Sequence, residues 1–230
     1  MGAVLKYAVR MRYIDFNPAA EIEKPKRINS HDEKEIAVLG PEKIQALFDN
    51  ARDLKDRVMF MTAVLTGMRQ GEILGLKWGD SDWSSRQIHV KRTYNHGRFY
   101  DPKSKASRRK IDLAPQLIKA LKEWRLASRF NVENDLVFPN PEGKPQNHTR
   151  MLRKSFHPTL IRAELPRMRF HDLRHTYASM LIEQGENIKY VQAQLGHSSI
   201  HMTLDVYGHL MDTVNQEAAS RLGEFVFGDS

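Results

Sequence analysis

The chain has 230 residues, and its 36 Lys and Arg against 28 Asp and Glu give a formal net charge of +8 at pH 7. With 40% hydrophobic and 28% charged residues, it has the composition of a globular protein that can bury its own core. The absence of cysteine excludes a disulfide scaffold, a cysteine nucleophile, an iron–sulfur cluster and a cysteine-based zinc finger. The basic surplus favours a nucleic acid over an acidic lipid as partner, although +8 alone does not distinguish this from charge that serves solubility.

The sequence predicts neither a membrane span nor a signal peptide. It contains no run of 18 apolar residues, and Lys6, Arg10 and Arg12 interrupt the apolar stretch near the N-terminus.

The N-terminal region predicts one short helix followed by a linker. Residues 3–13 carry apolar side chains at helical spacing, and Pro18 follows the end of that pattern. Residues 23–35 are polar and lack apolar periodicity, as expected of a linker. Because one helix cannot bury its own apolar stripe, residues 1–23 are either the remnant of a larger domain or an extension packed on the main domain.

The remainder predicts an α+β fold, mainly α-helical with a small antiparallel β-sheet. Helices are expected from Pro41 onward and over 56–66, 69–76, 115–129, 148–164, 172–184, 187–195, 199–207 and 211–224. The helix over 56–66 is apolar nearly all round and should be buried, with Gly67 as its C-terminal cap. Alternation over 86–94 predicts a strand, and 97–113 predicts one or two more around a basic turn.

A helix beginning near residue 171 would present an imidazole and a guanidinium together. His171 and Arg174 stand one i,i+3 step apart, beside the apolar stripe. A helix start favours anions, and the forked donors of arginine match phosphate oxygens. The alternative is that Arg174 pairs with Asp172 or another carboxylate at the helix end.

Arg69 follows the buried helix and its glycine cap, so it should emerge near the interior and need an anion there. Glu72, three residues further on, is either that anion or the group that orients Arg69 toward a phosphate.

Cations crowd the basic turn, at Lys103, Lys105, Arg108, Arg109 and Lys110. Most should be solvated, but a turn between strands can place one lysine on a ligand. With a lowered pKa, such a lysine acts as a general acid.

Tyr207 should lie near the end of the helix that follows Gly196-His197. A tyrosine hydroxyl, with its free pKa of about 10, becomes a nucleophile where cations stabilise the phenolate. A lone tyrosine is more often half-buried in a core with its hydroxyl bonded outward.

Taken in order, the Arg, Lys, His-x-x-Arg, Gly-His and Tyr signals resemble the tyrosine recombinases, the phage-integrase family. The resemblance covers roughly residues 36–226 and is carried by TGMRQGEILGLKW, by HDLRHTYASMLIEQG and by VQAQLGHSS with TLDVYGHL. It implies the fold of the family's catalytic domain over residues 36–230. Residues 1–23 would then be the last helix of a core-DNA-binding domain, and residues 24–35 the linker.

The resemblance also implies roles for individual residues. Tyr207 would attack the scissile phosphate and form a 3′-phosphotyrosyl bond. Arg69 and Arg174 would hold the non-bridging oxygens, and Glu72 would support Arg69. His171 would accept the tyrosine proton or help to stabilise charge.

His197 would donate a hydrogen bond to the phosphate. A lysine of the basic turn would protonate the departing 5′ oxygen; Lys103 stands in the family's Pro-Lys-Ser context, and Lys105 is the alternative. The DNA-binding cations implied are Arg69, Lys103, Lys105, Arg108, Arg109 and Arg174. Asp112 departs from the family, which often has proline there, but at a strand end it should not touch the chemistry.

The implied function is that of a site-specific DNA recombinase, such as a prophage or mobile-element integrase. Two arginines, a lysine and two histidines supply charge and protons without a metal, and the phosphotyrosine conserves bond energy, so no cofactor or ATP is expected. No P-loop and no carboxylate cluster suited to Mg²⁺ occurs in the sequence.

The implied partners are double-stranded DNA attachment sites, further copies of the chain in a homotetramer on DNA, and host DNA-bending or excision factors. The free protein is expected to be a monomer in the cytoplasm of a bacterial host, associated with the nucleoid. The helix over 211–224 is expected to dock on a neighbouring subunit, with packing on its own domain as the alternative.

Two other function classes compete. A metallohydrolase would use His171 and His175, spaced i,i+4, but a Glu base is missing between them and Arg174 would repel the metal. A DNA-binding module without catalysis would suit the basic charge equally well, yet all the catalytic side chains are present. The related type IB topoisomerases share the chemistry but fit the linker and the motifs less well.

Overall fold

The computed structural model describes residues 2–19, 37–101, 108–208 and 216–228. The chain divides into two compact units, Met1–Ile36 and Ala37–Ser230. In the first unit, α1 spans Gly2–Arg10 and ends before the predicted residue 13, because Arg12 takes up a left-handed conformation with φ of 56°. The predicted linker, 24–35, lies outside the described residues.

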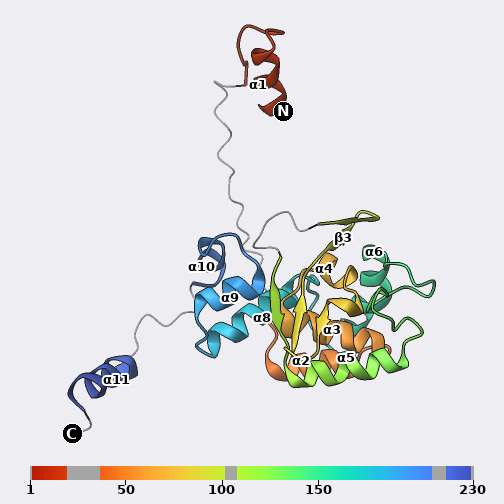
Figure 1. Ribbon diagram of the computed structural model, residues 1–230, viewed down its shortest axis with the longest axis vertical. Helices are drawn as coiled ribbons and strands as arrows, with labels where there is room; N and C mark the ends of the chain where they lie inside the picture. Colours follow the sequence, from red (N-terminus) through yellow and green to blue (C-terminus); the bar gives the residue numbers. More distant parts are fainter. Residues whose placement is uncertain (1, 20–36, 102–107, 209–215, 229–230) are drawn as a thin grey trace. The chain divides into compact units, whose positions relative to one another are not determined.

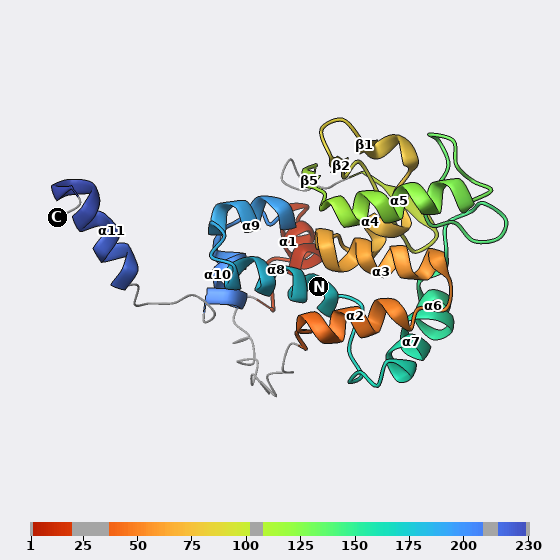
Figure 2. The same ribbon diagram turned by 90° about the horizontal axis from the view of Figure 1, so that it is seen from below.

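The second unit is built around the helix α3 (Leu54–Thr66). Its other helices are α2 (Pro41–Asp49), α4 (Gln70–Leu74), α5 (Pro115–Ala127), α6 (His148–Met151), α7 (His157–Arg162), α8 (Asp172–Glu183), α9 (Ile188–Leu195), α10 (His201–Tyr207) and α11 (Gln216–Phe227). The side chains of Val58, Met59 and Phe60 on α3 are fully buried. Helices α2, α5 and α8 pack around α3 (Figure 2), so the predicted buried central helix is confirmed.

Two small antiparallel sheets accompany the helices. The first has the order β1 (Ser81–Asp82), β2 (Gln87–His89), β5 (Lys110–Asp112), and the second pairs β3 (Thr93–Asn95) with β4 (Arg98–Tyr100). A 3₁₀ turn, Trp78–Asp80, precedes β1. Ile88 faces Ile111 across the first sheet, and both side chains are buried.

The single strand predicted over 86–94 is therefore wrong, since it is divided between the two sheets. The chain turns away between them at Arg92, whose guanidinium pairs with Asp80 and also donates to the carbonyl of Gly75. Val90 still donates its N–H to the carbonyl of Arg109, 2.9 Å away. The anchored Arg92 then directs Thr93 toward Tyr100 in the second sheet.

The helix predicted over 148–164 is helical but not uniform. A π-helical segment, Leu152–Phe156, separates α6 from α7. It ends two residues before Pro158, which has no N–H to continue the α-helical ladder.

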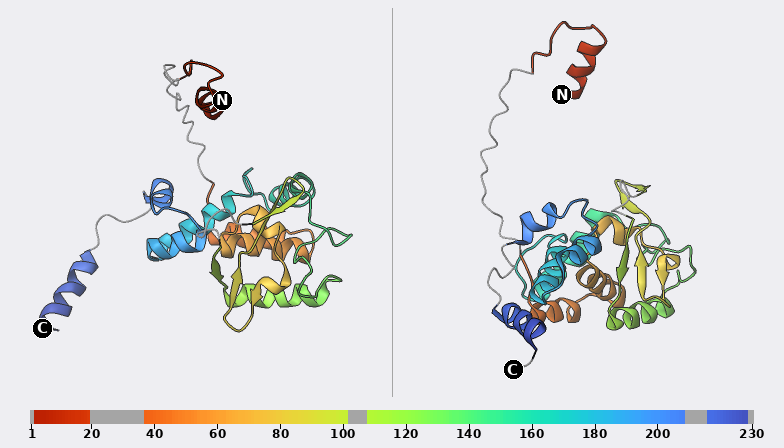
Figure 3. Two further views of the ribbon diagram at one scale, coloured as in Figure 1. Left: turned by 45° about the horizontal axis from the view of Figure 1, so that its top comes forward. Right: turned by 60° about the vertical axis from the view of Figure 1, so that its left-hand side comes forward.

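Helices α8, α9 and α10 lie side by side at one end of the second unit (Figures 1 and 3). They share a separate apolar cluster that contains Tyr177, Leu195 and Tyr207. Helix α3 ends against this group at Gly67, whose φ of 58° is left-handed. Any Cβ at Gly67 would lie 2.4 Å from Cδ1 of Tyr177, so the close approach requires glycine as well.

The C-terminal helix α11 exposes Leu222, Phe225 and Val226. Within the described ranges, no helix is both long and apolar enough to cross a lipid bilayer.

Replacing Gly67 with alanine should lower the free energy of unfolding by about 2 kcal/mol or more, because it adds left-handed strain to a steric overlap with Tyr177. Urea denaturation measures this. Gly208→Ala is the control, since its φ is −59° and its added Cβ meets nothing within 4 Å. Equal stability of the two variants would contradict the close packing of α3 on α8.

Candidate active site

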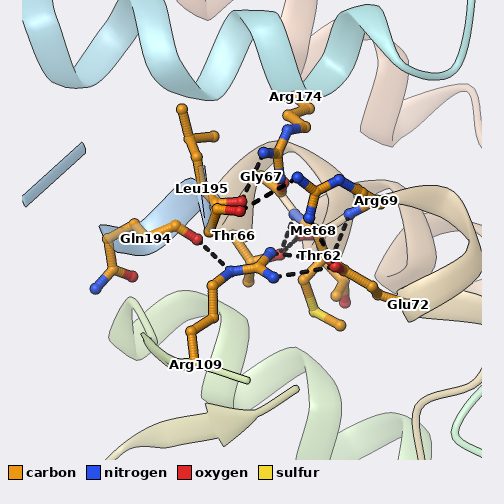
Figure 4. A network of polar contacts seen from close by, with 11 residues as sticks. Thr62, Thr66, Gly67, Met68, Arg69, Glu72, Arg109, Arg174, Gln194 and Leu195 are labelled. Atoms are coloured by element: carbon orange, nitrogen blue, oxygen red, sulfur yellow. Dashed lines mark hydrogen bonds and ion pairs between the residues drawn. The ribbon is translucent and has the colours of Figure 1, made fainter. Parts of the chain in front are cut away.

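Arg174 is a buried cation held by the ends of two helices. It lies in the first turn of α8, and the residue is 3% exposed. Its Nη1 donates to the carbonyl of Gly67 and its Nη2 to the carbonyl of Leu195, both at 2.6 Å (Figure 4). These carbonyls stand at the C-terminal ends of α3 and α9, where the helix dipole is negative.

Arg174 has no carboxylate partner among the described residues, so the predicted alternative of a pair with Asp172 is wrong. Asp172 pairs with Arg169 instead, at 2.7 Å. Burial, and then the charges of Arg69 and Arg109, lower the pKa of Arg174 to about 9, which still leaves it protonated at neutral pH. A buried charge held only by carbonyl dipoles is one that an anion would stabilise.

Arg69 lies beside it, at the start of α4. Its backbone N–H donates to Oε2 of Glu72 at 2.8 Å, and its Nη1 donates to Oε1 at 3.1 Å. Its Nη2 donates to the carbonyl of Gly196 at 3.3 Å. With 37% of its side chain exposed, Arg69 is the part of this group that solvent or a ligand reaches.

Arg109 was predicted to contact DNA, but the structure places it in the interior with 5% of its side chain exposed. Its Nη1 and Nη2 donate to the two carboxylate oxygens of Glu72, at 3.0 and 2.9 Å, and its Nε donates to the carbonyl of Gln194 at 2.6 Å. Its neighbour Arg108 is exposed. Arg109 therefore holds Glu72 in place inside the protein, whereas Arg108 faces the solvent.

Glu72 is thus shared by two arginines (Figure 4). Burial raises the pKa of Glu72, but the hydrogen bonds and charge of Arg109, together with the charge of Arg69, outweigh burial and hold the pKa below its usual range. The carboxylate is ionised, and the predicted support of Arg69 by Glu72 agrees with this geometry.

The C-terminal end of α9 organises all three arginines. The successive carbonyls of Gln194, Leu195 and Gly196 accept from Arg109, Arg174 and Arg69 in turn. Three guanidinium groups meet one carboxylate here, which leaves a surplus of two positive charges in this network. Such a surplus, preorganised by the fold, is a site for an anion such as a phosphodiester.

Both predicted histidines border this group. His197 directly follows Gly196, and its Nδ1 lies 2.9 Å from Oγ1 of Thr203. Burial, and then the charges of Arg174 and Arg69, lower the pKa of His197 to about 4. Burial, and then His175 and Arg174, lower the pKa of His171 to about 4. Both rings are neutral at pH 7 in the absence of an anion.

Tyr207 ends α10, as predicted, and is 3% exposed. Its hydroxyl lies 2.6 Å from Nδ1 of His175. Burial raises the pKa of Tyr207 to about 12, against the opposing effect of the Arg174 charge. From the sequence, His175 was predicted only as a candidate metal ligand; its position one helical turn after His171 is the signal that could have placed it at the same site.

Lys103 and Lys105 fall in residues 102–107, outside the described residues.

The rings of His171 and His175, the pair that a metallohydrolase would use, meet edge to face with centroids 5.1 Å apart. Among the residues that the structure describes, no group of three or more His, Asp and Glu side chains is arranged to hold a metal ion.

Asp112 fixes α9 on the sheet. Its Oδ2 accepts from the hydroxyl of Tyr190 at 3.0 Å and from Nε2 of Gln194 at 3.3 Å, and its Oδ1 accepts from Nε2 of Gln87 at 2.8 Å. It does not contact the arginines, but it ties down the helix that holds them.

Comparison with known proteins agrees with this architecture. The sequence model of the phage integrase family matches residues 37–213. A tyrosine recombinase XerC-like protein of Caldanaerobacter subterraneus subsp. tengcongensis is 31% identical over 95% of this chain and 62% of its own length. The ICEBs1 integrase of Bacillus subtilis is 33% identical over 75% of this chain and 50% of its own length. The chain thus spans between half and two thirds of these relatives.

Solved structures share the fold. The Tn1549 transposon integrase, in complex with circular intermediate DNA, superposes with a TM-score of 0.74 at 22% identity, over 97% of this chain and 76% of the other. The catalytic domain of bacteriophage HP1 integrase matches in full, with a TM-score of 0.56 at 24% identity over 85% of this chain. The chain belongs to the phage integrase family, and its larger unit has the fold of a tyrosine recombinase catalytic domain.

Proposed function

We propose that this chain is the catalytic part of a site-specific DNA recombinase, the integrase of a prophage or other mobile element. It cleaves and rejoins DNA through a 3′-phosphotyrosyl intermediate, without metal or ATP. The observation that carries this proposal is the surplus of positive charge around Glu72, with Tyr207 close by on α10. Residues 1–23 belong to a core-DNA-binding domain in this proposal, with 24–35 as the linker.

The scissile phosphate occupies the anion site. Arg69 and Arg174 donate to its non-bridging oxygens while Tyr207 attacks the phosphorus and the 5′ oxygen leaves in line. Negative charge then builds on the equatorial oxygens, where donors fixed by the fold stabilise the transition state more than the ground state. The carbonyls that fix Arg174, at 2.6 Å, mean that little reorganisation is left for the reaction itself.

The remaining groups handle charge and protons. His197 donates a hydrogen bond to the phosphate, and His171 lies at the start of α8 where it stabilises the developing charge or takes up the tyrosine proton. Lys103 or Lys105 protonates the departing 5′ oxygen. Because the phosphotyrosyl bond conserves the energy of the broken bond, a 5′ hydroxyl reverses the step and rejoins the strand.

Double-stranded DNA attachment sites are the proposed substrates. Solved structures of the Tn1549 integrase and of the XerH recombinase hold DNA, and the basic composition supports the same partner here. The chain acts as a homotetramer on DNA and is a monomer when free, in the cytoplasm of a bacterial host and with its nucleoid, with DNA-bending or excision factors as further partners. The exposed Leu222 and Phe225 on α11 suit docking on a neighbouring subunit.

Tyr207→Phe should abolish covalent DNA adducts, a loss of more than about a thousandfold, while DNA affinity stays unchanged. The assay incubates wild type and variant with supercoiled DNA, with and without EDTA, quenches with SDS and locates the nucleotide by mass spectrometry. It is run on this chain alone and on this chain extended at its N-terminus by a core-DNA-binding domain. No adduct from either wild type would favour a DNA-binding module, and adducts lost only in EDTA would favour a metalloenzyme.

Arg109→Met should lower the adduct-forming rate about 10- to 100-fold, because Glu72 then pairs with Arg69 alone and draws it from the phosphate. Adding Glu72→Gln to Arg109→Met should restore part of that rate. The double variant again has a surplus of two positive charges, from Arg69 and Arg174, and Arg69 no longer pairs with a carboxylate. Quench-flow measurement of adducts tests both variants, with thermal melting to verify folding.

Lys110→Met is the matched control, because it removes an exposed cation from the neighbouring position. A double variant slower than Arg109→Met would mean that the Arg109–Glu72 pair serves the fold and not the balance of charge.

Arg108→Ala should weaken DNA binding without changing the cleavage rate of bound DNA. Loss of one exposed phosphate contact should reduce the slope of log affinity against log salt by about one. A filter-binding titration at several salt concentrations measures the slope; an unchanged slope would remove Arg108 from the DNA-binding surface.

A further inference from the structure

We propose that His175 is the group that receives the proton of Tyr207 when the tyrosine attacks DNA and returns it when the strand is rejoined. The inference rests on the proposed function and assigns within it a catalytic role to a residue that the motif comparison left without one. It also leaves His171 free to act on the phosphate.

The contact between the two side chains carries the proposal. Tyr207 ends α10 and His175 lies in α8, yet the tyrosine hydroxyl stands 2.6 Å from Nδ1 of the imidazole. The rings also pack on each other, with centroids 5.7 Å apart. In the described part of the chain, His175 is the hydrogen-bonding partner of this hydroxyl, and no such bond joins the hydroxyl to His171.

The surroundings of Tyr207 exclude bulk water as the acceptor of its proton. Tyr207 is 3% exposed and shares an apolar cluster with Leu195 and Tyr177, so bulk water is not at hand to take its proton. Burial raises the pKa of Tyr207 to about 12, so the resting hydroxyl keeps its proton and needs an acceptor to become a nucleophile.

The state of His175 suits an acceptor. Burial lowers its pKa, the charges of Arg169 and Arg174 act in the same direction, and Asp172 opposes them. The ring is therefore neutral before reaction and has one nitrogen with a free lone pair. With Nδ1 as that nitrogen, the hydroxyl donates to it along the contact that already exists.

Entry of the phosphodiester changes the balance. Its single negative charge offsets one of the two surplus positive charges and so favours a proton on His175. In cleavage, the O–H bond of Tyr207 breaks and the proton moves to Nδ1 as the phenolic oxygen bonds to phosphorus. The bond from phosphorus to the 5′ oxygen breaks, and that oxygen takes a proton from the lysine proposed above. Rejoining reverses each transfer, and the imidazolium of His175 reprotonates the phenolate.

His171 occupies a different place. It directly precedes α8, and its ring packs edge to face with the ring of His175, with centroids 5.1 Å apart. Among the described residues, it is His175 and not His171 that bonds to the Tyr207 hydroxyl. Burial, and then the charges of His175 and Arg174, lower the pKa of His171, and the proposed function assigns this ring to the phosphate. The histidine before α8 and the histidine within it thus have different tasks in this proposal, His171 at the phosphate and His175 at the nucleophile.

The test measures the rate of the Tyr207–DNA adduct in variants of His175. His175→Ala should slow it about 10²- to 10⁴-fold, the usual contribution of general acid–base catalysis, while DNA affinity remains that of wild type. His175→Asn should be as slow, because its amide accepts a hydrogen bond but cannot take up a proton. An Asn variant with the wild-type rate would overturn the proposal, since it would show that His175 only positions the tyrosine.

A second measurement separates proton transfer from misfolding. Fluorinated tyrosine, incorporated at position 207, has a more acidic phenol and depends less on a base. The defect of His175→Ala should therefore shrink by tenfold or more in the fluorotyrosine protein, which a folding defect would not do. The matched control is His171→Ala, whose defect should stay the same.

Shrinkage for the His171 variant alone would overturn the proposal and make His171 the base. Adducts from wild type, absent with Tyr207→Phe, must be seen first. Absence of wild-type adducts would contradict the proposed recombinase function itself. That outcome differs from failure of the His175 proposal alone, in which adducts form but do not depend on His175 as a base.

Discussion

The candidate active site depends on the C-terminal end of helix α9, which accepts hydrogen bonds from all three of its arginines. The C-terminal end of helix α9 presents three successive carbonyls to three guanidinium groups, and among the described residues Glu72 alone balances their charge. The end of α3, the start of α4 and Arg109, the residue before β5, all meet here because each contributes an atom to this network. Burying a cation costs free energy unless all its donors are hydrogen-bonded. The arginines can therefore stay charged inside the protein only because these elements pack together, and the proposed chemistry depends on that charge.

Local signals made much of this predictable. The apolar helix α3 and the glycine after it were placed correctly because both depend on neighbouring residues, and the motifs located Arg69, Arg174 and Tyr207. The role of Arg109 was not predictable, since its partner Glu72 lies 37 positions away and every cation in a basic run looks alike in sequence. The contact of His175 with Tyr207, 32 positions apart, depends in the same way on how helices pack.

The unbalanced charge has a thermodynamic counterpart. A folded domain that carries two uncompensated positive charges loses stability to their repulsion, and it regains it when an oxyanion binds the folded form and not the unfolded one. If the proposed function holds, DNA stabilises the folded domain as a ligand in addition to being its substrate. The same linkage makes phosphate or sulfate a stabilising solute for the free protein.

Asp112 adds a mechanical consequence. Through Tyr190 and Gln194 it fastens the helix that carries all three carbonyls. Because all three guanidinium groups are hydrogen-bonded to this one helix end, a tilt of α9 would act on all three at once. A substitution at Asp112 would therefore shift the positions of all three arginines through α9, although Asp112 itself does not contact them.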